Sequence, residues 1–260
     1  MITTYHRPQT LAEALALLAQ PNTYPLAGGT ALNTPGFQKN LPADFAVVDL
    51  QSLGLDGIRK VGNNLEIDAC VTLQQLLESP HCPLALQQAI RLETSLNIRN
   101  AASIAGSLVT CTGRSTFGTA MLSLDARLAL AGGSTSALQG LGDLFALRDE
   151  LLRGKLITQI TIPVNVKFAF EMVARTPADL PIVCAAVTQW SSGRTRLALG
   201  GWGAAPLLAM DGTEPDGLEA AARSASQDAS DEWASAEYRI DVAATLAKRC
   251  LDQALSHEIS

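Results

Sequence analysis

The first third of the chain alternates between helical and extended patterns of hydrophobic residues. Leu11, Leu15 and Leu18 recur on one face of a helix. Thr10 and Glu13 form a T-x-x-E capping box in front of that helix. The apolar runs after this helix predict extended segments at residues 24–27, 45–50 and 65–69.

The middle of the chain is richer in helical patterns. Thr72 and Gln75 form a second capping box, and the helix that it starts ends before Pro80. The remaining elements predicted here are helices at residues 83–95 and 119–130, the second running into a strand, and an exposed turn rich in Gly, Ser and Thr at residues 132–140.

The pattern changes after Pro163. The alternating run LITQITI at residues 156–162 predicts a strand that ends at this proline. Further strands are predicted at residues 167–174, 182–190 and 195–200, and then helices at residues 217–225 and 235–254. Mixed helices and strands, followed by strands and then helices, are typical of an α+β protein. We expect a domain boundary near Pro163.

The composition is that of a chain with a folded core. Of its 260 residues, 47% are hydrophobic and 17% are charged. The net charge of −6 argues against nucleic acid or an anionic membrane as a partner. The opening MITTYHRPQT has no signal-peptide pattern, and no apolar stretch approaches the ~20 residues of a membrane span. We therefore expect a soluble, cytoplasmic protein.

The residues that commonly hold metals are few and scattered. The five cysteines include no C-x-x-C pair, and they are Cys70, Cys82, Cys111, Cys184 and Cys250. Only three histidines are present, and they lie far apart in the sequence. This distribution predicts free thiols, and neither a disulfide framework nor a zinc or iron–sulfur site in this chain.

Two glycine-rich segments are candidate ligand sites, and the first is YPLAGGTALNT at residues 24–34. Gly28 and Gly29 allow left-handed backbone angles and remove side chains that would keep an anion from the amides. Thr30 adds a hydroxyl donor. The segment matches neither the G-x-G-x-x-G nor the P-loop fingerprint. Its alternatives are an anion-binding turn and a tight connection between a strand and a helix.

The second segment is NIRNAASIAGSLVTCTGRST at residues 97–116. Its small residues let another backbone or a flat ligand approach closely. Its many hydroxyls suit a polyhydroxylated ligand that carries a pyrophosphate, and they belong to Ser103, Ser107, Thr110, Thr112, Ser115 and Thr116. The alternative is a buried turn whose hydroxyls bond to its own backbone.

The order of several motifs resembles the flavin-binding subunit of the molybdenum hydroxylases, the family of xanthine dehydrogenase and carbon monoxide dehydrogenase. The motifs are AGGTAL (27–32), IRNAASIAGSL (98–108), MLSLDA (121–126), LITQITIP (156–163), ALGGWGAAPLLA (198–209) and SAEYRIDVAATLAKRCL (235–251). They cover nearly the whole chain. Within the family, the chain is most similar to the short flavoprotein subunits of purine-type hydroxylases.

This resemblance implies a two-part FAD-binding region of the PCMH type and a C-terminal α+β domain with a small antiparallel sheet and helices. The FAD-binding region would span residues 1–163, with subdomains of about 1–53 and 54–163, and the C-terminal domain residues 164–260. Backbone amides facing the pyrophosphate would come from Ala27, Gly28, Gly29, Thr30, Ala31 and Leu32. The second turn would be lined by Ala102, Ser103, Gly106, Ser107 and Thr110, with Ser115 and Thr116 after it. Ile157 would lie beside the isoalloxazine ring.

The resemblance also implies a role in electron transfer. FAD would take electrons from iron–sulfur clusters of one partner subunit, while a molybdopterin-binding large subunit hydroxylates the substrate. A flavin carries its own redox chemistry, so we expect no catalytic side chain in this chain. The alternative is a flavin-poor or flavin-free structural subunit of the same kind of complex.

That alternative comes from departures from the family pattern at the ligand. The family's Asp, Gly, Asn, Pro, Asp and Lys are replaced here by Ala31, Ala105, Ser107, Gly113, Thr116 and Glu171. Four lost hydrogen bonds at ~0.5–1.5 kcal/mol each would weaken FAD binding by ~2–6 kcal/mol. Glu171 beside the ring would disfavour an anionic reduced flavin. Arg114 is either a compensating cation near the pyrophosphate or a solvated side chain.

Overall fold

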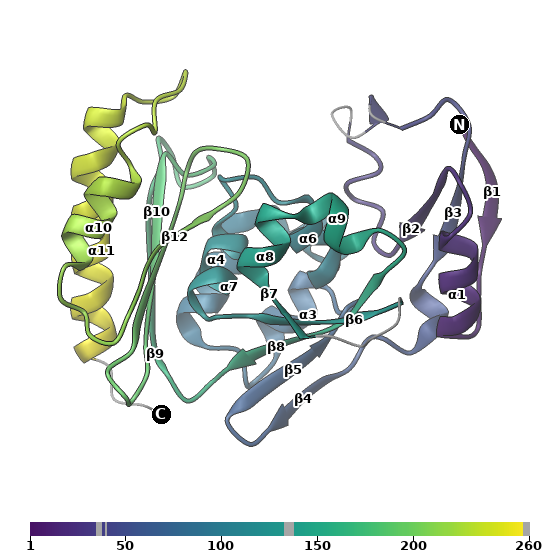
Figure 1. Ribbon diagram of the computed structural model, residues 1–260, viewed down its shortest axis with the longest axis horizontal. Helices are drawn as coiled ribbons and strands as arrows, with labels where there is room; N and C mark the ends of the chain where they lie inside the picture. Colours follow the sequence, from purple (N-terminus) through teal and green to yellow (C-terminus); the bar gives the residue numbers. More distant parts are fainter. Residues whose placement is uncertain (35–37, 40, 133–137, 257–260) are drawn as a thin grey trace.

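The computed structural model describes residues 1–34, 38–39, 41–132 and 138–256. Its strands form three sheets, which follow one another along the chain (Figure 1). We call them the N-terminal, central and C-terminal sheets. None of the helices in the described ranges is long and apolar enough to cross a membrane.

The N-terminal sheet has three parallel strands. In chain order its elements are β1 (Ile2–His6), α1 (Leu11–Leu18), β2 (Thr23–Leu26) and β3 (Phe45–Asp49). β3 lies between β1 and β2 and runs parallel to both. Ala14 of α1 is buried with Val48 and Leu50, and with Leu156 from the central sheet. This small cluster joins the N-terminal sheet to the rest of the molecule.

The central sheet is antiparallel and has the order β4-β5-β8-β6-β7. Its strands are β4 (Ile58–Val61), β5 (Asn64–Asp68), β6 (Arg127–Ala131), β7 (Leu138–Gly140) and β8 (Leu156–Pro163). Seven helices of the described chain belong with it: α3 (Leu73–Glu78), α4 (Leu84–Glu93), α5 (Leu96–Arg99), α6 (Ile104–Thr110), α7 (Thr116–Ser123), α8 (Leu141–Ala146) and α9 (Arg148–Leu152). Figure 1 shows these helices gathered on one side of the sheet.

The C-terminal sheet is an antiparallel meander in the order β12-β11-β10-β9. Its elements are β9 (Lys167–Val173), β10 (Val183–Gln189), β11 (Thr195–Gly200), β12 (Leu207–Gly212), α10 (Leu218–Ala225) and α11 (Ala236–Ser256). α10 and α11 cover one face of this sheet, and α4 and α7 lie against the other (Figure 1).

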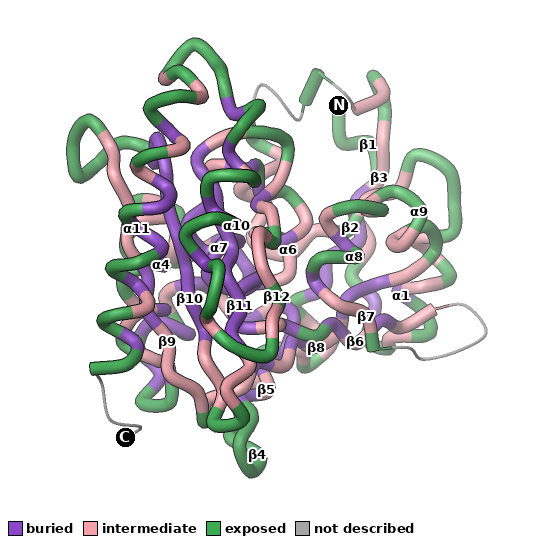
Figure 2. Tube along the Cα trace, turned by 60° about the vertical axis from the view of Figure 1, so that its left-hand side comes forward, coloured by how far each residue is buried: buried purple, intermediate pink, exposed green. Residues whose placement is uncertain are grey.

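One hydrophobic core extends from the central helices to the inner face of the C-terminal sheet. It contains Phe117 and Met121 of α7 together with Phe170 of β9 and Ala186 of β10. All eight residues of α7 are buried. Figure 2 shows the same concentration of buried residues along β10 and β11. α7 is therefore the element that most closely joins the central sheet and its helices to the C-terminal sheet.

The predicted α+β class is confirmed, and so are most of the predicted elements. Thr72 and Gln75 form both halves of their capping box. Thr10 caps α1 through the backbone N–H of Glu13, whereas the Glu13 carboxylate accepts from Gln9. β8 ends at Pro163, and the next strand belongs to another sheet, although the hydrophobic core continues across this point. The division into domains stays a prediction.

Several elements differ from the prediction. The segment at residues 97–116, predicted as a turn, includes most of α5 and the whole of α6. α6 can begin here because the Ser103 hydroxyl caps its start. The helix predicted at residues 119–130 begins at Thr116 and ends at Ser123, since Asp125 takes a left-handed φ of 55° before β6. The exposed turn predicted at residues 132–140 includes residues 133–137, which lie outside the described residues.

Candidate functional site

The first glycine-rich segment leaves the end of β2 and lies directly against the second. A Cβ atom at Gly28 would lie 2.5 Å from the carbonyl carbon of Ala101 and 3.2 Å from the Cα of Ala102. Only glycine fits that contact without a shift of the backbone. Gly29 has a left-handed φ of 68° and turns the chain away from the strand. The structure thus brings together the two segments that the sequence singled out.

The first segment also offers a row of free backbone donors. Within the described part of the chain, none of the backbone N–H groups of residues 28–32 donates a hydrogen bond. The carbonyls of the turn are engaged instead: Asn33 Nδ2 donates to Gly29 O at 3.0 Å, and Thr34 Oγ1 donates to Ala31 O at 2.8 Å. Successive free amides in a turn attract an anion through their aligned dipoles. This arrangement favours the anion-binding alternative.

The second segment is more self-contained. The Ser103 hydroxyl, which is almost fully buried, accepts from Gly106 N at 3.2 Å, and Thr110 Oγ1 donates to Gly106 O at 2.8 Å. Ala105 N donates to Ala69 O. Gly106 itself is exposed and Ser107 is half-buried, and the Ser107 hydroxyl donates no hydrogen bond among the described residues. Gly106 thus offers this wall an open surface without a side chain, and Ser107 offers a hydroxyl.

Ser115 and Thr116 lie in the interior. Both hydroxyls donate to the Glu93 carboxylate at 2.9 Å, and Phe117 N donates to it at 2.8 Å. Thr116 Oγ1 also lies 2.8 Å from Ala89 O, and the Thr116 side chain has no exposed surface. Burial raises the pKa of Glu93, and the hydrogen bonds at the start of α7 oppose that shift. These two residues fasten α7 to α4 and have no free hydroxyl to offer a ligand.

Glu93 was not among the predicted site residues. It lies at the end of α4, and from the sequence a single carboxylate at the end of a helix is expected to be an ordinary solvated residue. Only the approach of α7 shows its role.

Ile157 is also enclosed. It is 3% exposed, belongs to β8, pairs in register with Leu130 of β6 and lies in the central core.

Glu171 belongs to β9 of the C-terminal sheet. It lies on the face of β9 that meets α11, where its carboxylate accepts from Gln253 Nε2 and lies 3.9 Å from Arg249. Lys167 shares that face and reaches the carbonyl of Leu255. A residue at this register faces α11, away from α7 and the central helices, because successive strand residues point to opposite faces. The place of Glu171 beside the flavin ring therefore stays a prediction.

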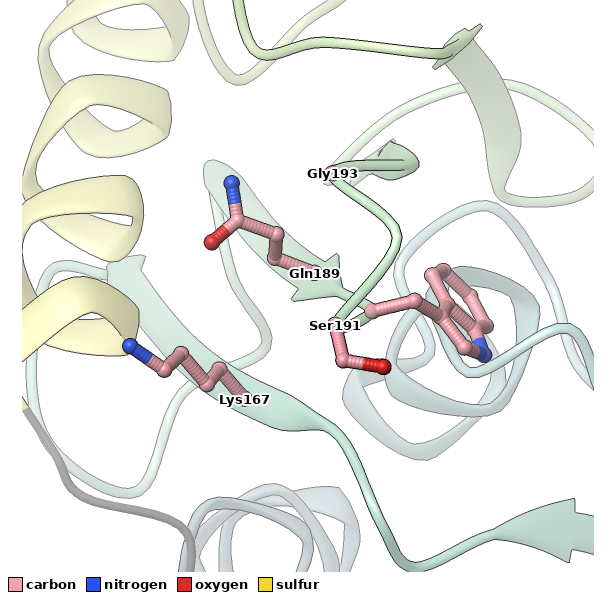
Figure 3. Close-up of a pocket in the computed structure, with 5 residues that line it drawn as sticks. Lys167, Gln189, Ser191 and Gly193 are labelled. Carbon is pink, nitrogen blue, oxygen red and sulfur yellow. The ribbon is translucent and has the colours of Figure 1, made fainter.

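Two open surface cavities lie at some distance along the chain from the glycine-rich segments. Figure 3 shows the smaller, of about 200 Å³, with Lys167, Gln189, Ser191 and Gly193 around it. The larger, of about 310 Å³, shares Trp190 with it. Neither is lined by a residue of the two glycine-rich segments, so these cavities are not the candidate site.

The described residues contain no cluster of three His, Cys, Asp or Glu side chains that could hold a metal ion. All five cysteines are free, and burial raises the pKa of each thiol, for Cys70 to about 11. A thiol with a raised pKa is a poor nucleophile at neutral pH.

The residues at the two segments fit the diphosphate of a dinucleotide. Among the described residues, the five N–H groups of residues 28–32 donate no hydrogen bond, and no acidic side chain stands between Ala27 and Thr34 to repel an anion. The close contact at Gly28 leaves the exposed Gly106 and the half-buried Ser107 on a wall that adjoins this turn. The chemistry of the donor set is that of backbone dipoles, with no cation required.

Comparisons with known proteins agree with this fit. The sequence model of the family described as "FAD binding domain in molybdopterin dehydrogenase" matches residues 1–165. The chain is 30% identical to the carbon monoxide dehydrogenase medium chain of Afipia carboxidovorans, with 96% of each chain covered. It is 27% identical to the glyceraldehyde dehydrogenase medium chain of Sulfolobus acidocaldarius, with 80% of this chain and 78% of that one covered.

The fold is similar as well. A structure of reconstituted carbon monoxide dehydrogenase from Oligotropha carboxidovorans contains a chain that superposes with a TM-score of 0.82, at 28% identity and with 98% of each chain covered. The chain therefore belongs to the family of FAD-binding medium subunits of carbon monoxide dehydrogenase-like molybdenum hydroxylases.

Proposed function

We propose that this chain is the electron-transfer subunit of a multi-subunit molybdenum hydroxylase. It takes electrons from the iron–sulfur clusters of a partner chain and passes them to an external acceptor. The observation that carries the proposal is the turn at residues 28–32, which packs against Ala101 through Gly28 and whose backbone N–H groups donate no hydrogen bond within the described part of the chain.

The residues of the two segments bind and orient FAD. The amides of residues 28–32 would donate to the diphosphate, and Gly29, with its left-handed φ, forms part of the turn that carries them. Gly106, without a side chain, lets the ligand approach the start of α6, and the Ser107 hydroxyl donates to it. FAD, when bound, supplies the chemistry of accepting and releasing electrons, so the protein contributes binding, orientation and shielding from water.

The partners are an iron–sulfur subunit and a molybdopterin-binding large subunit. This assignment is supported by the relatives, which are named medium chains of carbon monoxide and glyceraldehyde dehydrogenases. Those two relatives act on different substrates, so the substrate of the complex depends on the large subunit. A cytoplasmic location stays the prediction made from the sequence.

The test is the absorbance spectrum of the purified chain. Flavin bands near roughly 370 and 450 nm, released as FAD on heating, are expected. Isolation from the native host should bring down the two partner subunits, identified by mass spectrometry. A colourless protein that takes up no added FAD would overturn the proposal and favour the flavin-free structural subunit.

A further inference from the structure

The segment after α6 meets the C-terminal part of the chain backbone to backbone. Gly113 N donates to Gly203 O at 3.1 Å, and Gly201 N donates to Gly113 O at 2.7 Å. A Cβ atom at position 113 would lie 2.5 Å from the carbonyl carbon of Trp202 and 2.7 Å from Gly203 O. Neither proline, which lacks the N–H, nor any residue with a side chain fits this contact. That explains why glycine stands where the family pattern has proline.

Arg114 adds a second contact beside the first. Its Nε donates to Pro181 O at 3.0 Å, and its Nη2 donates to Leu180 O at 3.1 Å. Its guanidinium lies 4.4 Å from the centre of the Trp233 ring, close enough for a cation–π interaction. Arg175 lies 5.0 Å from the same ring. Arg114 is therefore neither a free solvated side chain nor committed to the pyrophosphate, which were the two alternatives from the sequence.

The loops that contact Gly113 and Arg114 are themselves bonded to the buried Arg239 of α11. The Trp233 backbone N–H donates to Asp231 Oδ1 at 2.8 Å, and Asp231 accepts from Arg239 Nη2 at 2.8 and 2.9 Å. Arg239 Nε also donates to Ile182 O at 3.1 Å, and its guanidinium lies 5.7 Å from the Trp202 ring. The loops that receive Gly113 and Arg114 are thus fixed by one fully buried arginine.

Hydrogen bonds to other segments consequently hold α6 at its start and just beyond its end. At its start, Ile104 N donates to Val71 O at 2.8 Å within the central part of the chain. Beyond its end, Arg148 Nη2 donates to Cys111 O at 3.2 Å, and the contacts of Gly113 and Arg114 follow directly. We propose that Gly113 and Arg114 form a latch by which the C-terminal part of the chain fixes the end of α6, and with it the second wall of the cofactor site.

The effect on the cofactor rests on the proposed function, whereas the latch itself does not. Neither residue touches the site in this arrangement, so Arg114 is a positioning residue. Its loss frees the end of α6, loosens the wall that carries Gly106 and Ser107, and speeds the release of FAD.

The test compares Arg114→Ala with Arg114→Lys and with Arg223→Ala as the control. Arg223 forms an exposed ion pair with Asp241 in the same C-terminal part of the chain. Two rates are measured on the purified chain: amide hydrogen exchange at residues 113 and 201, and release of bound FAD followed by its fluorescence. Arg114→Ala should raise both rates at least tenfold, because the loss of a single hydrogen bond to a charged group already corresponds to about that factor.

Arg114→Lys, which keeps the cation on Trp233 but not the fork on the carbonyls, should fall between Arg114→Ala and the wild type. Arg223→Ala should change neither rate. Unchanged exchange in Arg114→Ala overturns the latch. Faster exchange with unchanged FAD release overturns the positioning role. If the chain binds no FAD, the proposed function fails, and exchange alone decides the latch.

Discussion

Replacing Gly28 by alanine is the most direct test of the two-segment site. The new Cβ would lie 2.5 Å from the Ala101 carbonyl carbon, whereas ordinary contacts begin near 3.4 Å. The turn must therefore retreat from Ala101 by at least about 1 Å. Both obstructing groups are backbone, so no side chain can swing aside to make room.

The expected cost follows from that retreat. Overpacking of a tight contact costs ~1–3 kcal/mol in folding free energy. If the shift also removes two of the hydrogen bonds that residues 28–32 would donate to FAD, at ~0.5–1.5 kcal/mol each, FAD binding weakens by ~1–3 kcal/mol. That corresponds to about a 5- to 150-fold rise in the dissociation constant.

The assay is fluorescence titration of the flavin-depleted chain with FAD, paired with thermal unfolding. Gly142→Ala is the matched control, because a Cβ there lies 3.7 Å from Leu122 Cδ1 and meets no backbone of another element. Gly28→Ala should weaken binding while Gly142→Ala leaves it unchanged. If Gly28→Ala bound FAD within about threefold of the wild type, the turn would not be the binding element, and the reasoning from the contact at Ala101 would be refuted.

Three further predictions concern stability. Arg196→Ala removes the buried guanidinium that Asp125 and Asp211 share, while Arg194 still pairs with both carboxylates. The unfolding free energy should fall by ~1.5–3 kcal/mol in a urea titration, and a loss below ~0.5 kcal/mol would contradict the shared ion pair. Thr72→Ala removes the cap of α3 and should cost about 1 kcal/mol, read as a lower melting temperature. Burial raises the pKa of Glu93, so this residue's contribution to the unfolding free energy is present below the ordinary glutamate range and is lost as pH rises through the folded pKa. Glu93→Gln should flatten that part of the profile of melting temperature against pH. An unchanged profile would refute the role of Glu93 in the pH dependence.

Local features of the fold were predictable from the sequence, since they depend on neighbours within a few residues. The capping box at Thr72 and the end of β8 at Pro163 are of this kind. β1 was missed because four of its five residues are exposed and carry no hydrophobic alternation. The insertion of β3 between β1 and β2 was also out of reach, because strand pairing is set by contacts far apart in the chain.

The candidate site was predictable where backbone chemistry defines it and not where side chains do. Gly28 and Gly29 stand out because glycine allows left-handed backbone angles and close approach of another backbone. Ser115 and Thr116 resemble ligand donors in the sequence, but the hydroxyls of both are taken by Glu93, more than twenty residues away. The face of β9 on which Glu171 lies is set by the pairing of β9 with β10 and by the packing of α11, and a motif match carries no information about either.

The positions of the family departures reduce the penalty that they imply for FAD binding. Four lost bonds would cost ~2–6 kcal/mol, but Thr116 is fully buried and bonded to Glu93, and the amide of Ala105 is engaged with Ala69. If FAD binds as proposed, the departures that still remove a hydrogen bond to it are Ala31 and Ser107. The penalty then falls to ~1–3 kcal/mol, and Ser107 recovers part of it through its hydroxyl. Since the donors at residues 28–32 are backbone groups, they survive the loss of an aspartate at Ala31, and binding of FAD is compatible with this altered site.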